Sequence, residues 1–217
     1  MTRISGSQIL KAPCCGVTMQ SPAYASINFS ANENWTDGKA IGVLFNKDGQ
    51  LRKCLCGKPF FLRDALTGVV IKHGDPILSA ESIPSAPYIS DDEVMVLLNL
   101  SGLPAEIEIA LRQRLWRLSN DAFRDVYRAH MESNSSDMPR YDLSPAQAQN
   151  LIALKALLLN SKREDVILLA EIERTLGNFA AALRLLEHVS MHEVKLAQML
   201  KGLAKVNYCG PARYRDN

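Results

Sequence analysis

The pattern of apolar and polar positions divides the chain into a strand-rich first part and a helix-rich remainder. Between residues 23 and 72, short apolar runs alternate with polar breaks that contain glycine, which is the pattern of strands joined by turns. Asp48 and Gly49 separate the runs at 43–45 and 51–53. Because glycine tolerates the positive φ of a hairpin turn, these two runs are predicted to pair, and the run at 68–71 is predicted to add a strand.

A segment rich in proline and serine separates the two parts. Residues 76–89 contain three prolines, which prevent a long helix, so this segment is predicted to connect two domains. The predicted division is a cysteine-bearing β domain over residues 1–75, a linker over 76–89 and a helical domain over 90–217. The predicted fold class is therefore α+β.

Four serines mark predicted starts of helices. Each is followed three residues later by Glu or Gln, so that the two side chains can satisfy free backbone amides in a capping box. The four pairs are Ser90 with Glu93, Ser144 with Gln147, Ser161 with Glu164, and Ser190 with Glu193. Residues 104–132 are predicted to hold two further helices, broken near Ser119 and Asn120.

The pattern of residues 166–189 predicts a helical hairpin. Ala170 and Ala182 are small enough to let two antiparallel helices approach closely, and Gly177 stands between the helices. Over about residues 162–189 the segment resembles one tetratricopeptide repeat, and that resemblance implies a surface that binds peptides or proteins. An ordinary helical bundle would use the same packing.

Cysteines supply the clearest candidate chemistry. Four of the five fall in two short segments, and the fifth, Cys209, stands far away. The N-terminal residues lack the apolar run of a secretion signal and no apolar stretch is long enough for a bilayer, so a cytoplasmic protein without a membrane segment is expected. In that setting paired cysteines indicate a metal before disulfides. The predicted ligands of a structural Zn²⁺ are Cys14, Cys15, Cys54 and Cys56.

The segments APCCG and CLCGKPF resemble the zinc knuckles of zinc-ribbon modules, over about residues 10–63. Adjacent cysteines in the first segment, and a one-residue gap in the second, replace the usual two-residue gap. Because neighbouring residues of a strand point to opposite sides, the first pair reaches one ion only if residues 13–16 form a turn. Two alternatives stay open: His73 replaces Cys14 as a ligand, or the thiols are reduced core residues without a metal.

The function favoured by the sequence is a non-enzymatic, zinc-stabilised protein that binds protein partners as an adaptor or regulator. No glycine-rich phosphate loop or nucleophile-elbow motif is present. The net charge of +2 is small for a nucleic-acid binder, although the first 80 residues are net positive. A zinc-dependent hydrolase is a third possibility, but it needs an open coordination position, which four cysteines would close.

In the alternative function, basic and aromatic side chains of the N-terminal domain bind nucleic acid. The candidates are Lys39, Lys47, Arg52, Lys53, Lys58 and Arg63, with Trp35, Phe60 and Phe61 as stacking groups. Trp35 is itself predicted to pack in the core of the small β domain, beside the metal site.

Two other constellations are interpreted as structural. Five arginines alternate with acidic residues and are predicted to form a solvated, self-paired helix surface. They are Arg112, Arg114, Arg117, Arg124 and Arg128. His188 and His192 have the spacing of helical metal ligands, but the capping box at Ser190 places a helix start between them, so no metal site is assigned there.

Overall fold

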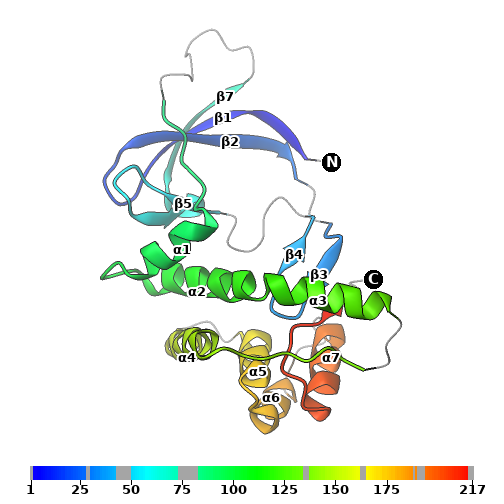
Figure 1. The fold of residues 1–217 in the computed structure, drawn as a ribbon. Coiled ribbons are helices and arrows are strands. Elements are labelled where there is room, and N and C mark those ends of the chain that lie inside the picture. The colour runs from blue at the N-terminus through cyan, green and yellow to red at the C-terminus, as the bar shows by residue number, and fades with distance from the viewer. Residues whose placement is uncertain are drawn as a thin grey trace. The chain divides into compact units, whose positions relative to one another are not determined.

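The fold is known from a computed structural model, which is α+β. An antiparallel β region in the N-terminal part is followed by seven helices among the described residues, as the sequence predicted (Figure 1). None of these helices has the length and apolar content that crossing a membrane requires. The structure describes residues 2–27, 30–42, 50–72, 83–133, 137–161, 165–187, 189 and 194–214.

The chain separates into two compact units that are interleaved along the sequence. Unit 1 consists of Met1–Ser30 and Gly42–Leu111, and unit 2 consists of Ala31–Ile41 and Arg112–Asn217. The sequence predicted consecutive domains instead. Residues 31–41 belong to unit 2, which holds most of the helices. Residues 83–89, the second half of the predicted linker, belong to unit 1.

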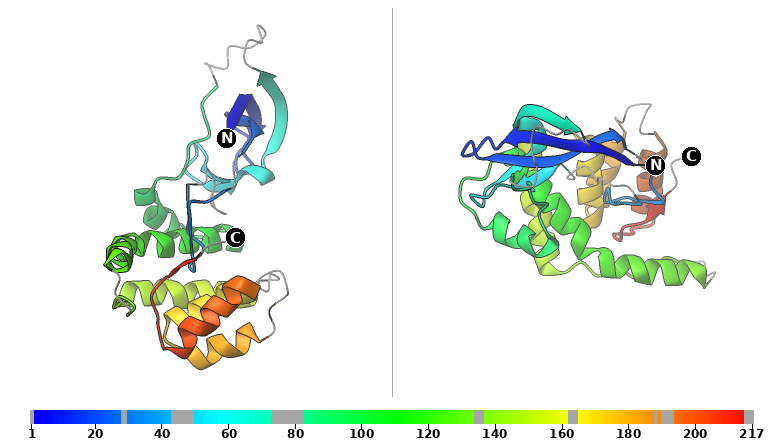
Figure 2. Two further views of the ribbon diagram at one scale, coloured as in Figure 1. Left: turned by 90° about the vertical axis from the view of Figure 1, so that its right-hand side faces the viewer. Right: turned by 90° about the horizontal axis from the view of Figure 1, so that it is seen from above.

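Two small sheets form the β part of unit 1. In the first, β1 (Arg3–Lys11) lies between β2 (Thr18–Ser26) and β7 (Leu66–Lys72), and both neighbours are antiparallel to it. These strands lie side by side in every view (Figure 1; Figure 2). In the second sheet, β5 (Leu51–Lys53) pairs with β6 (Pro59–Phe61). Each sheet therefore contains a hairpin, and each hairpin connection carries cysteines.

The strand predictions for this region are partly confirmed. The predicted strand at 68–71 falls within β7, and the predicted strand at 51–53 is β5. The proposed partner of β5, residues 43–45, lies outside the described residues. A 3-10 turn at Leu62–Asp64 follows β6 and leads the chain towards β7.

The segment just before the first helix is bonded to the strands. The Gln20 amide donates to the Pro84 carbonyl at 2.9 Å, and the Ala86 amide donates to the Gln20 carbonyl at 2.8 Å. The Lys53 amide donates to the Pro87 carbonyl at 3.1 Å. These bonds satisfy backbone groups of β2 and β5, so residues 83–89 are part of unit 1 and not a free spacer.

Two helices follow in this region, α1 (Asp91–Leu98) and α2 (Ala105–Ser119), and the division between the units falls within α2. The predicted capping box at the start of α1 is confirmed, with the Ser90 amide donating to Glu93 Oε2 at 2.8 Å. Glu93 also forms an ion pair with Lys53. That ion pair, together with the Ser90 amide, lowers the pKa of Glu93 to about 2.

Unit 2 contains the remaining helices of the described residues. They are α3 (Asp121–Glu132), α4 (Pro145–Asn160), α5 (Val166–Thr175), α6 (Phe179–Leu186) and α7 (Val194–Lys205). The last three pack against one another (Figure 1; Figure 2). The predicted break near residues 119–120 is confirmed, because α2 ends and α3 begins there.

The capping predictions differ in outcome. At α4 the Ser144 amide donates to Gln147 Oε1 at 2.9 Å, so that capping box is confirmed. The predicted start at Ser161 is wrong: its hydroxyl donates to the Leu158 carbonyl and so closes α4. Asp165 is the cap of α5 and accepts from a backbone amide at 3.1 Å. The pair at residues 190 and 193 lies outside the described residues, as do the histidines at 188 and 192.

The predicted helical hairpin is confirmed as α5 and α6. Ala170 and Ala182 are both fully buried, which lets the two helix backbones approach. Gly177 has φ +81°, a conformation that costs glycine nothing and that turns the chain between the helices.

A three-stranded sheet completes unit 2 and explains the position of Trp35. Strand β3 (Glu33–Trp35) pairs with β4 (Ala40–Ile41) and with β8 (Arg213–Tyr214). Trp35 is fully buried and meets the ring of Tyr127 edge-on at 5.1 Å. Its predicted burial is confirmed, but its predicted place beside the metal site is wrong, because it packs in the core of the helical unit.

Candidate metal centre

The first knuckle joins β1 to β2. The Ala12 amide donates to the Val17 carbonyl at 3.0 Å, and the Gly16 amide donates to the Ala12 carbonyl at 2.8 Å. Gly16 has φ +71°, where any other residue would be strained. These bonds close a turn over the two adjacent cysteines, so the turn that the sequence required at this point is present.

The second knuckle joins β5 to β6 and is built in a similar way. The Cys54 amide donates to the Lys58 carbonyl at 2.8 Å, and the Gly57 amide donates to the Cys54 carbonyl at 2.8 Å. Gly57 has φ +88°. In both knuckles, a left-handed glycine directly follows the last cysteine and turns the chain back into the next strand.

The two knuckles bring the four predicted ligands together. The sulfurs of Cys14, Cys15, Cys54 and Cys56 all lie within 4.8 Å of one another. The sulfur distances are 3.4 Å for Cys14 to Cys56, 3.4 Å for Cys15 to Cys54 and 4.0 Å for Cys14 to Cys15. A tetrahedral ion with metal–sulfur bonds of 2.3 Å separates its sulfurs by about 3.8 Å. The cluster therefore has the donors and spacing to hold one metal ion.

This geometry bears on the alternatives that the sequence left open. Cys14 belongs to the cluster, and its sulfur is as close to Cys56 as that of Cys15 is to Cys54. His73, the other candidate ligand, lies outside the described residues. All five cysteines are free thiols.

The cluster lies between the core of unit 1 and its surface. Cys54 is only 1% exposed and packs in a core with Leu10, Met19 and Phe60, whereas Cys56 is exposed. A metal bound here would tie a surface turn to the core of a small unit, which is the role of a structural site.

The thiols differ in their acidity. Burial raises the pKa of both Cys14 and Cys54. The backbone amide of Lys58, by contrast, donates to the sulfur of Cys56 and lowers the pKa of that thiol to about 7. Cys56 is therefore better prepared than Cys14 or Cys54 to supply a thiolate at neutral pH.

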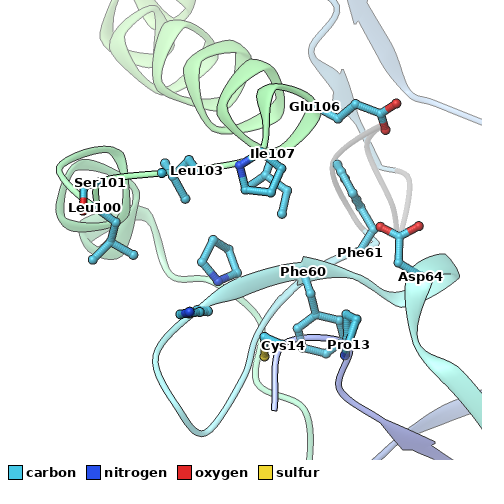
Figure 3. A pocket seen from close by; sticks show the side chains of 14 residues that line it. Pro13, Cys14, Phe60, Phe61, Asp64, Leu100, Ser101, Leu103, Glu106 and Ile107 are labelled. Carbon is cyan, nitrogen blue, oxygen red and sulfur yellow. The ribbon is translucent and has the colours of Figure 1, made fainter. Parts of the chain in front are cut away.

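A groove of about 760 Å³ borders the cluster within unit 1. Figure 3 shows Pro13 and Cys14 on one side of it, and Leu103 and Ile107 on the opposite side. The first side comes from the knuckles, and the second comes from the connection between α1 and α2 and from the first turn of α2. Cys14 therefore belongs both to the cluster and to the wall of the groove.

The groove is mostly apolar and carries charges at its rim. Asp64 and Glu106 lie at the same end of it (Figure 3). Both carboxylates pair with Arg63, which also lies over the ring of Phe61 at 4.4 Å. The single positive charge of Arg63 balances one of the two acidic charges at this end. Among the residues that the structure describes, Lys58 is the one basic residue that lines the groove.

The side chains considered for nucleic-acid binding are mostly engaged. The proposed stacking groups Trp35, Phe60 and Phe61 are buried, so none of them stands on the surface as a stacking platform. Among the basic candidates, Arg52 is also buried. Three others form ion pairs: Lys39 with Asp121, Lys53 with Glu93, and Arg63 with Glu106. Lys47 lies outside the described residues. These contacts count against a basic, aromatic binding surface.

Two members of the arginine series pair within their helix as predicted, Arg124 with Asp121 at 2.6 Å and Arg128 with Asp125 at 2.7 Å. Arg128 pairs with Glu33 at 2.9 Å. Arg117 and Arg124 are buried, which corrects the prediction of a solvated surface, and Arg124 pairs with the buried Asp37. The reason is that residues 31–41, distant in sequence, pack on these helices and bring the acidic partners.

Comparisons of the chain with protein-family models, with curated proteins and with solved structures found no significant match. The functional argument therefore rests on the geometry of the cluster and its groove. The sequence did not reveal the groove, because residues 100–107 reach the knuckles only through the fold.

Proposed function

We propose that unit 1 is a non-enzymatic, zinc-stabilised module that binds an apolar segment of a partner protein. In this proposal, Cys14, Cys15, Cys54 and Cys56 hold a structural Zn²⁺. The observation that carries the proposal is the shared position of Cys14, which belongs to the thiol cluster and lines the groove. The metal would fix the knuckle wall, and the fixed wall would shape the binding surface.

The donor set supports a closed zinc site. Four thiolates fill the tetrahedral coordination that zinc prefers, so no position is left for a catalytic water. This is why an adaptor or regulatory role is favoured over a hydrolase. Free thiols at this spacing also suit a reducing compartment, and we therefore place the protein in the cytoplasm.

The groove supports a peptide-like ligand. Its volume of about 760 Å³ lies within the range of ligand sites, and proline, leucine and phenylalanine side chains dominate its lining. Lys58 supplies a positive charge at the rim. The chemistry that fits is a short apolar segment flanked by an acidic side chain.

Site-specific photo-crosslinking tests this function in the cells that produce the protein. A photoreactive phenylalanine analogue at Leu100, which lines the groove and is 42% exposed, should give a discrete crosslinked partner. The same group at Ile152, which is 58% exposed on α4, is the matched control and should not. Adding Lys58→Glu should reduce the yield at Leu100 several-fold through charge repulsion.

The outcomes separate binding from metal content. Identical crosslinks at Leu100 and Ile152, or none at Leu100, would contradict a partner-binding groove. Elemental analysis of the untagged protein should give one zinc per chain. A chain without stoichiometric metal would contradict the zinc site and leave the groove to be judged by the crosslinks.

A further inference from the structure

The four sulfurs of the cluster are arranged as two close pairs. Cys14 and Cys56 have sulfurs 3.4 Å apart, and so have Cys15 and Cys54. Each pair joins one knuckle to the other. A disulfide bond is about 2.05 Å long, so each pair needs to close by only about 1.4 Å.

Pairing within the first knuckle is unfavourable by comparison. The sulfurs of Cys14 and Cys15 are 4.0 Å apart, and the chain has no cis peptide bond among its described residues. Adjacent α-carbons across a trans peptide are about 3.8 Å apart, which is shorter than the usual range of 4.4–6.8 Å for a disulfide. The cross-knuckle pairs are therefore the favoured partners.

Both close pairs are open to a small oxidant. Cys56 is exposed in one pair and Cys15 is exposed in the other, although Cys54 is buried. The contact between Cys14 and Cys56 lies at the surface, and that between Cys15 and Cys54 is partly buried. An oxidant that reaches the surface turns meets one sulfur of each pair, and meets the first pair more readily.

We propose that the cluster is a modification site for hydroperoxides, which convert the zinc-bound thiolates into two disulfides, Cys14–Cys56 and Cys15–Cys54, and release the metal. This inference rests on the proposed zinc site and adds its regulation. The two disulfides connect the same knuckles that the metal connects. The knuckles therefore remain joined after the metal has left.

The chemistry is balanced with hydrogen peroxide as the oxidant. In each pair, two thiolates lose two electrons and form one sulfur–sulfur bond. Each peroxide molecule takes up those two electrons and two protons, its oxygen–oxygen bond breaks, and two water molecules form. Two peroxide molecules and four protons thus convert the four-thiolate zinc complex into two disulfides, a free Zn²⁺ ion and four waters.

The test uses the full chain carrying Cys209→Ser, which removes the thiol outside the cluster. Its zinc content is measured first. Hydrogen peroxide is then added, and released zinc is followed with a chelating dye while free thiols are counted. Trypsin, which cleaves after Lys39 and Lys53, separates the two cysteine segments. Fragmentation both between Cys14 and Cys15 and between Cys54 and Cys56 then assigns each disulfide.

The expected result is the loss of four thiols for each zinc released, with the cross-knuckle disulfides assigned and Cys14–Cys56 formed first. A reducing agent with added zinc should restore both the thiols and the metal. Four results would overturn the inference: a Cys14–Cys15 disulfide, the opposite cross-pairing, sulfinic acids in place of disulfides, or zinc retained after peroxide treatment. A chain that holds no zinc at the outset would instead contradict the proposed metal site.

Discussion

Cys54→Ser is expected to abolish zinc binding and to unfold unit 1 while unit 2 stays folded. Cys54 is 1% exposed and packs among Leu10, Met19 and Phe60, so the change removes a ligand and also leaves a hydroxyl in an apolar core. Structural zinc sites contribute about 10–16 kcal/mol in small zinc-folded peptides at neutral pH. A unit of this size is not expected to tolerate that loss.

The measurement can follow the two units separately. Both tryptophans, Trp35 and Trp116, belong to unit 2, so their fluorescence reports on unit 2. In Cys54→Ser, the fluorescence transition in urea should be preserved, whereas hydrogen exchange in β1, β2 and β7 should become fast. Cys209→Ser is the control and should keep both the zinc and the slow exchange. Slow exchange in a zinc-free Cys54→Ser chain would show that the metal does not stabilise this unit.

Helix positions were largely predictable because their signals are local. Ser144 and Gln147 stand three residues apart, and a capping box needs only those two side chains and the backbone between them. The failure at Ser161 has an equally local cause. The same hydroxyl can close the preceding helix, and Asp165, four residues later, is available as a cap for the next one.

The gathering of the four cysteines was predictable for a different reason. Zinc ligation requires particular side chains, and four cysteines in two glycine-followed segments predict it without knowledge of the strands between them. What the sequence did not show was how adjacent Cys14 and Cys15 reach one site. That depends on backbone bonds from Ala12 and Gly16, which only the folded turn displays.

The path of residues 31–41 was not predictable, because it depends on long-range packing. Trp35 stands in the strand-rich part of the sequence, and local pattern assigns it to the β domain. In the structure, its ring packs against Tyr127 and lies near the guanidinium of Arg124, both of which are about 90 residues away in sequence. Helix and strand propensities and hydrophobic periodicity contain no signal for such a contact. The contact places residues 31–41 in unit 2, and the units are therefore interleaved along the sequence.

The same segment gives the second large expected effect, for Asp37→Ala in unit 2. Asp37 is buried, accepts from Asn120 at 2.9 Å and forms an ion pair with Arg124, whose side chain is 1% exposed. Removing the carboxylate leaves a buried guanidinium with less compensation, which typically costs about 3–5 kcal/mol. Asp121 remains within 2.6 Å of Arg124 and should place the loss towards the lower end of that range.

Urea unfolding followed by tryptophan fluorescence measures this loss directly, because both tryptophans lie in unit 2. Asp142→Ala is the matched control, since its ion pair with Arg140 is exposed, and it should change the free energy of unfolding by less than about 0.5 kcal/mol. Combining Asp37→Ala with Arg124→Met should recover part of the loss, because no buried charge is then left behind. If the double variant is no more stable than Asp37→Ala alone, the uncompensated charge is not the cause. The lost free energy of unfolding then belongs to the hydrogen bond with Asn120 and to the packing of the turn between β3 and β4.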